Sequence, residues 1–149
     1  MGPIHRTDLF LLGGEEVNEA VSLILRHFPD MQAVYLFGSY GTPYQRKDSD
    51  VDLALLLPPL RAIGLRNLVA HDCLYEMMDL MDCEVDLINL RMVDTAFQHQ
   101  IIQTGRVWFD SDPYERASFE VLVMGKYQKL NQERADILAD IGDTGKVLL

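Results

Sequence analysis

A Gly-Ser pair and two aspartates have the types and the spacing that favour chemistry. Gly38-Ser39 is followed, after ten residues, by Asp50-Val51-Asp52. Side chains two positions apart in a strand share a face, with about 7 Å between their Cα atoms. Asp50 and Asp52 can therefore both reach one Mg²⁺, which carboxylate oxygens bind at about 2.1 Å. Gly38 allows close backbone approach to a ligand, and Ser39 adds a hydroxyl and an N–H group. The combination predicts Mg²⁺-dependent phosphoryl chemistry on a nucleoside triphosphate.

The same residues could instead form a hairpin with two exposed aspartates. Against that interpretation, aspartate is depleted in strands, yet these two stand at the start of the apolar run 53–57. From average residue usage, a Gly-Ser pair followed at this spacing by Asp-x-Asp arises in roughly one in several hundred chains of this length. We therefore favour Asp50 and Asp52 as metal ligands and Gly38 and Ser39 as the phosphate-binding turn.

The elements that must position these residues are strands joined by a polar loop. The apolar run 34–37 predicts a short buried strand that ends at Gly38. Residues 41–49 form the loop, and a second strand is predicted over 50–57. Pro58-Pro59 closes that strand.

A third strand, predicted over residues 83–90, adds more carboxylates. Val85 and Leu87 fall on one of its faces, whereas Glu84 and Asp86 fall on the other. Either acidic residue is a candidate for the site. The alternative is that they only discourage aggregation at a sheet edge.

Helices are predicted over 15–28, 64–81, 93–104 and 113–139, and a fourth strand over 106–109. The last helix has a strong start signal, with Asp112 at the N-cap, Pro113 at N1 and Glu115 at N3. This order of elements predicts a small α/β or α+β domain with one mixed β-sheet and helices packed on it. Residues 1–14 are an N-terminal extension, 15–139 the domain, and 140–149 a tail that we expect to fray.

Length and charge restrict the class of protein. A chain of 149 residues is sufficient for one domain, and its 48% hydrophobic content is that of a globular protein. It has no apolar run of membrane-spanning length, and its start lacks the pattern of a signal peptide. The net charge of −10 lacks the basic footprint of a nucleic-acid binder and would suit docking on a basic partner. Cys73 and Cys83 have no zinc spacing, so we expect reduced thiols in a cytoplasmic protein.

Gly38-Ser39, ten residues and Asp50-Val51-Asp52 together resemble the signature of the DNA polymerase β-like nucleotidyltransferase superfamily. More narrowly, the chain resembles the MNT-type minimal nucleotidyltransferases, sharply over 34–57 and loosely over 15–139. The resemblance implies the polymerase β-like nucleotidyltransferase fold and a third acidic residue from a later strand. Asp86, framed Val-Asp-Leu as Asp52 is, matches that place better than Glu84. Asp50, Asp52 and Asp86 would then be the catalytic and metal-binding residues, with two Mg²⁺ ions. Whether Asp86 is a ligand or a base stays open.

Some members of the MNT group act as antitoxins. Resemblance to them implies a partner, a HepT-like HEPN ribonuclease toxin. The resemblance then implies an antitoxin that transfers AMP from ATP to a tyrosine hydroxyl of that toxin, with no direct binding of nucleic acid. Two alternatives stay open. The chain could modify a small molecule such as an aminoglycoside, although it leaves no residues for a domain that grips one. It could also be an antitoxin that binds without catalysis.

Overall fold

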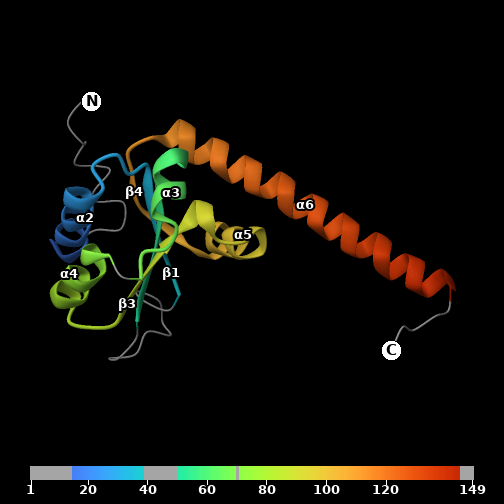
Figure 1. Cartoon of the computed structure of the whole chain (residues 1–149), viewed down its shortest axis with the longest axis horizontal. Coiled ribbons are helices and arrows are strands. Elements are labelled where there is room, and N and C mark those ends of the chain that lie inside the picture. The colour runs from blue at the N-terminus through green and yellow to red at the C-terminus, as the bar shows by residue number, and fades with distance from the viewer. Residues whose placement is uncertain (1–14, 39–49, 70, 145–149) are drawn as a thin grey trace.

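The computed structural model describes residues 15–38, 50–69 and 71–144 (Figure 1). Its centre is a four-stranded sheet in the order β3-β2-β1-β4. The strands are β1 (Ala33–Phe37), β2 (Val51–Leu56), β3 (Val85–Asn89) and β4 (Arg106–Asp110). β1 pairs antiparallel with both β2 and β4, whereas β2 and β3 are parallel. The predicted mixed sheet is confirmed, with each strand displaced by no more than a few residues.

Helices cover both faces of the sheet (Figure 1). α2 (Glu15–His27) and α4 (Asp72–Met81) lie on one face, while α5 (Thr95–Thr104) and α6 (Pro113–Thr144) lie on the other. Alternation along the strands supplies a separate core to each layer. On the α2 side, Leu53 and Leu55 of β2 are buried, and on the α5 side Ala54 and Leu56 are buried. The sheet is therefore apolar on both faces.

The prediction of one helix over 64–81 is wrong. The chain forms two helices here, one that ends at Leu65 and one that begins at Asp72. α3 (Pro59–Leu65) begins directly after Pro58, with Pro59 at its first position, where a missing N–H costs nothing. The chain leaves α3 at Arg66, whose φ is 58°. α4 then begins after His71, whose Nδ1 accepts a hydrogen bond of 3.1 Å from the N–H of Cys73. Met77 and Met81 of α4 are buried in the core.

The last helix is longer than predicted. α6 begins as expected, with the Glu115 N–H donating to the Asp112 carboxylate at 3.1 Å, but it continues to Thr144 rather than ending at residue 139. The first part of the expected tail is thus helical. Phe119 and Val123 of α6 are buried, whereas Leu122 is exposed. Figure 1 shows the second half of α6 extending away from the sheet.

A chain of hydrogen bonds fastens the start of α6 to the sheet. The hydroxyl of Tyr35 on β1 donates to the Glu120 carboxylate at 2.8 Å. Arg116 donates to Glu120 at 2.9 Å and to Asp110 of β4 at 2.6 Å. Burial raises the pKa of Tyr35, and the neighbouring Glu120 charge raises it further, so the phenol stays neutral as a donor.

None of the helices within the described part of the chain is both long enough and apolar enough to cross a bilayer.

We expect Gly105→Ala to destabilise the fold by roughly 1–3 kcal/mol. A Cβ on Gly105, between α5 and β4, would lie 2.5 Å from the Ile101 carbonyl oxygen and 3.1 Å from that of Leu36. Both obstacles are backbone atoms, so neither can move cheaply. Urea unfolding followed by circular dichroism measures the change. Gly64→Ala in α3 is the control, because nothing lies within 4 Å of its Cβ position. Equal stability of both variants would contradict this account.

Candidate active site

The central strand β2 places its aspartate between two neighbouring strands. Asp52 pairs with Phe37 at the end of β1 and, on the other side, with Asp86 of β3. Because paired residues in parallel strands stand side by side about 4.8 Å apart, the two carboxylates project from the same face. That face is the one covered by α5, which Ala54 shares two residues along β2. The register of β2 and β3 therefore brings the Asp52 and Asp86 carboxylates side by side.

The pKa of Asp52 reflects the neighbouring carboxylates. The pKa of Asp52 is raised from 3.8 to about 6. Burial of the carboxyl group is the largest cause, followed by a hydrogen bond shared with Asp86 and by the negative charges of Asp86 and Asp50. Like charges gathered at one edge of a sheet resist ionisation unless a cation joins them. The site is therefore poised to accept positive charge.

Gly38 supports this arrangement in a way that its place after the strand did not reveal. Its φ is +76°, in the region that favours glycine. A Cβ at this position would lie 2.3 Å from Oδ2 of Asp52, which no real contact allows. The missing side chain thus makes room for the aspartate as well as for a ligand.

The other predicted site residues lie at different distances from this pair. Asp50 is exposed just before β2, close enough for its charge to raise the Asp52 pKa. Glu84, the rival of Asp86, precedes β3, and its carbonyl accepts a hydrogen bond of 2.9 Å from the Val51 N–H. Asp86, not Glu84, is the register partner of Asp52. Ser39 lies outside the described residues.

An aromatic pair borders the carboxylates. Phe37, the β1 partner of Asp52, stands edge-on to Phe97 of α5, with ring centroids 5.8 Å apart and planes at 81°. Both rings are partly exposed and pack against the core on this side of the sheet. One side of the site is therefore apolar.

Histidines join helices in both layers of the fold. His27, at the end of α2, is hydrogen-bonded to Glu76 of α4, and its ring stands edge-on to that of His71 at 5.5 Å. On the other side of the sheet, His99 of α5 stacks on Tyr127 of α6 at 3.7 Å. These contacts join helix to helix on each layer. Only tertiary structure brings together partners 49 and 28 positions apart.

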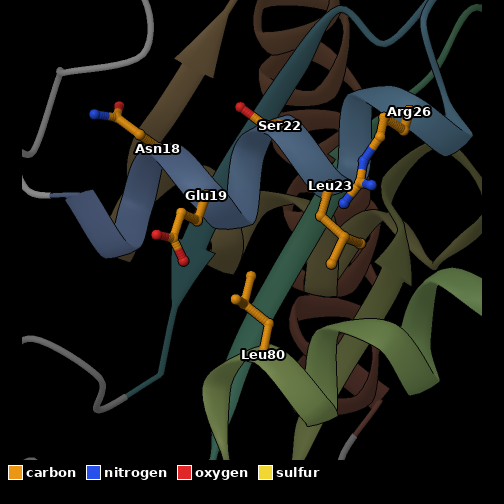
Figure 2. A pocket seen from close by; sticks show the side chains of 6 residues that line it. All are labelled: Asn18, Glu19, Ser22, Leu23, Arg26 and Leu80. Atoms are coloured by element: carbon orange, nitrogen blue, oxygen red, sulfur yellow. The ribbon is translucent and has the colours of Figure 1, made fainter.

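A groove beside α2 is separate from this site. It lies between α2 and α4 and has a volume of about 340 Å³. Figure 2 shows Leu23 and Leu80 pointing toward each other across it, with Glu19 and Arg26 on either side. The groove is on the face of the sheet opposite the one that carries the carboxylates, so we assign it no part in the chemistry.

The donor set fits Mg²⁺ better than a transition metal. Within the described ranges, no group of three or more His, Cys, Asp or Glu side chains is gathered closely enough to hold a metal by itself. Asp52 and Asp86 nevertheless stand together, with oxygen as the only donor atom. Mg²⁺ is commonly bound by one or two carboxylates that leave its other positions for water and substrate phosphates. Two adjacent carboxylates therefore suit a metal that arrives with a nucleotide.

Residues 19–114, which contain the strands and both carboxylates, match the family described as "Polymerase beta, Nucleotidyltransferase". The chain belongs to this family of nucleotidyltransferases. It is also 30% identical over 124 residues to protein adenylyltransferase MntA of Shewanella oneidensis, a match that covers 83% of this chain and 86% of that protein. The resemblance inferred from Gly38 and the aspartates is confirmed at the level of the family and of the fold.

Solved structures agree. One chain of a crystal structure of a toxin–antitoxin with AMP-PNP superposes with a TM-score of 0.66 at 27% identity, covering 86% of this chain and 98% of that one. Another comes from a tri-AMPylated Shewanella oneidensis HEPN toxin in complex with MNT antitoxin. It superposes with a TM-score of 0.60 at 26% identity, over 83% of this chain and 93% of that one.

We expect Asp52→Asn to raise the thermal midpoint of the metal-free protein at pH 8. The folded chain holds the Asp52 proton more tightly than the unfolded chain does, because its pKa rises from 3.8 to about 6. The fold therefore gains stability as the pH falls from about 6 to about 4, and loses it when Asp52 ionises. Asparagine cannot ionise, so the two melting curves should converge near pH 4. Melting in EDTA across this range is the measurement. A wild type that matches the variant at pH 8 would contradict the raised pKa.

Gly38→Ala should displace the Asp52 carboxylate and lower the transfer rate by about 100-fold or more, since a misplacement of about 1 Å can cost that much. We also expect Mg²⁺ to raise the thermal midpoint of the wild type, and Gly38→Ala should remove this increase. The metal-dependent midpoint separates this effect from lost nucleotide binding, because the melt contains no nucleotide. Unchanged stabilisation of the variant by Mg²⁺ would mean that the absence of a side chain at Gly38 does not determine the position of the Asp52 carboxylate.

Proposed function

We propose that this protein is an antitoxin that transfers AMP from ATP to a tyrosine hydroxyl of a cognate HEPN ribonuclease toxin and so inactivates it. The observation that carries the proposal is the pairing of Asp52 with Asp86 beside Gly38, in a chain of the nucleotidyltransferase family. A similar curated protein is named a protein adenylyltransferase, and a similar chain comes from a complex of an AMPylated HEPN toxin with its antitoxin.

The reaction joins the acceptor oxygen to the α-phosphorus of ATP. The tyrosine oxygen attacks that phosphorus in line, the bond from the α-phosphorus to the bridging oxygen breaks, and pyrophosphate leaves. The hydroxyl proton must also depart, and a free tyrosine has a pKa of about 10. A carboxylate with a raised pKa is better suited to take up a proton near neutral pH than an ordinary aspartate is. In the metal-free chain, Asp52 has such a raised pKa.

Each site residue then has a distinct task. Asp50, Asp52 and Asp86 would hold Mg²⁺, and Gly38 with Ser39 would hold the β- and γ-phosphates. When bound, Mg²⁺ neutralises the triphosphate and stabilises the leaving pyrophosphate. Asp86 would serve the acceptor side, as a metal ligand or as a base. Phe37 and Phe97 exclude water from one side of the carboxylates.

The charge of the chain suits such a partner. A ribonuclease must bind a polyanion and so presents a basic surface, on which a protein of net charge −10 docks favourably. Each AMP added near the ribonuclease active site brings a negative phosphate and considerable bulk. RNA would then be excluded by repulsion and by steric overlap. The two free cysteines and the use of ATP agree with action in the cytoplasm.

The test is to incubate this protein with ATP, Mg²⁺ and the HEPN toxin encoded beside it, and to weigh the toxin by intact mass spectrometry. A gain of about 329 Da per AMP, set by the chemistry of adenylylation, is expected. Asp52→Asn and Asp86→Asn should each reduce the rate by about 100-fold or more.

Glu84→Gln is the matched control, since it removes a carboxylate two residues from Asp86 and should leave transfer unchanged. An inactive Glu84→Gln with an active Asp86→Asn would exchange the two assignments. If Asp52→Asn protein neutralises the toxin as well as wild type does, with no gain in mass, the chain acts by binding alone. A mass gain on an aminoglycoside, and none on the toxin, would favour the small-molecule alternative.

A further inference from the structure

The first half of α6 has a second apolar surface, turned away from the sheet. Tyr114, Val121 and Leu122 expose 77, 72 and 53% of their surface, although each is a large apolar side chain. Together with Ala117 and Ser118 they line an open, mostly apolar groove of about 450 Å³. Such a surface on a charged protein marks an interaction site more often than chance exposure does.

Helical spacing joins these residues into one stripe. Positions 114, 117, 118, 121, 122 and 125 recur every three or four residues, so they share one side of the helix. Phe119 and Val123, which are 5 and 1% exposed, occupy the opposite side and pack on the body of the protein. Nothing lies within 4 Å of the position that a Cβ on Gly125 would take, so the stripe is open at that end too. We call these six residues the outer face of α6.

The outer face is complementary in shape to a second, antiparallel copy of itself. From its start, the face carries a large residue, two small ones, two large ones and a glycine. In an antiparallel pair of such helices centred between Ser118 and Val121, Tyr114 of one copy faces Gly125 of the other. Leu122 likewise faces Ala117, and Val121 faces Ser118. Large side chains thus meet small ones at every level, as close packing between helices requires.

Charge shows the same self-complementarity. Glu115 and Lys126 lie eleven residues apart, three helical turns, along one border of the outer face. In the antiparallel pair just described, Glu115 of each copy comes within two positions, about 3 Å along the helix axis, of Lys126 of the other, and symmetry makes this contact twice. In a parallel pair in register, the borders that carry Glu115 and Lys126 lie on opposite sides of the contact, so this ion pair is not made.

We propose that two copies of this chain associate through the outer face of α6 in an antiparallel, two-fold symmetric dimer. The stripe spans about 17 Å, the length of eleven helical residues, so the interface is at the small end of specific interfaces. The dimer is accordingly expected to dissociate at micromolar concentrations. The proposal is independent of the transferase activity, because it needs neither nucleotide nor toxin.

Sedimentation equilibrium of the full chain, from about 1 to about 300 µM, tests the association. Wild type should pass from monomer to dimer over this range. Val121→Lys places an unpaired charge at the centre of the contact and should leave only monomer. Ile137→Lys is the matched control, because Ile137 is 60% exposed on the same helix but on its other side. That variant should dimerise like wild type, and circular dichroism should show all three chains folded.

Two further variants test the orientation of the helices. Lys126→Glu should weaken the dimer by about tenfold, as expected for two exposed ion pairs, and adding Glu115→Lys should restore it. Separately, a chain carrying Tyr114→Cys and Gly125→Cys should form disulfide-linked dimers on mild oxidation. The two positions are about 17 Å apart within one helix, too far for a disulfide inside one copy. Wild type, with its own two cysteines, controls for background crosslinking.

Three results would overturn the proposal. The first is a chain that stays monomeric at every concentration. The second is a dimer that survives Val121→Lys, which would place the contact elsewhere. The third is a monomeric chain whose complex with the HEPN toxin is lost on Val121→Lys and kept on Ile137→Lys. In that case the outer face would belong to the toxin and not to a second copy.

Discussion

Two carboxylates held next to each other against their mutual repulsion are the constraint on which this structure depends. Asp52 and Asp86 come from different strands and meet only because β2 and β3 run parallel and in register. A parallel pair cannot be joined by a tight turn. The chain between them therefore crosses one face of the sheet through α3 and α4 before it returns as β3. The placement of two side chains thus accounts for the route of about thirty residues.

The repulsion between the two carboxylates is tolerated because the sheet that carries them is buried on both faces. Val51, Leu53 and Leu55 of β2 face the layer of α2 and α4, while Ala54 and Leu56 face that of α5 and α6. Their burial exceeds by far the cost of one raised pKa, since each buried aliphatic side chain contributes about 1.5–3 kcal/mol. The end of the sheet that carries Asp52 and Asp86 can consequently be electrostatically unfavourable without unfolding the protein. A bound cation would convert the same cluster into a stabilising one.

Much of this could be predicted from the sequence, since the signals concerned are local. Alternation along β3 separated Val85 and Leu87 from Asp86, and the start of α6 followed from Asp112 and Pro113. Other features depended on tertiary contacts. The break between α3 and α4 rests on a cap by His71, a residue with several possible roles. The contact of Gly38 with Asp52 depends on the pairing of two strands, and no pattern within either strand contains it.

The crossover between β2 and β3 also sets an order of events during synthesis. β1 and β2 are neighbours along the chain and can pair as soon as residue 56 has left the ribosome, since local contacts form quickly. Asp86 emerges about thirty residues later, and its strand can join the sheet only after α3 and α4 have closed the longer loop. A nascent chain therefore carries an incomplete pair of carboxylates for much of its synthesis. The pairing of Asp52 with Asp86 is completed only late in folding, when the non-local strand β3 is in place.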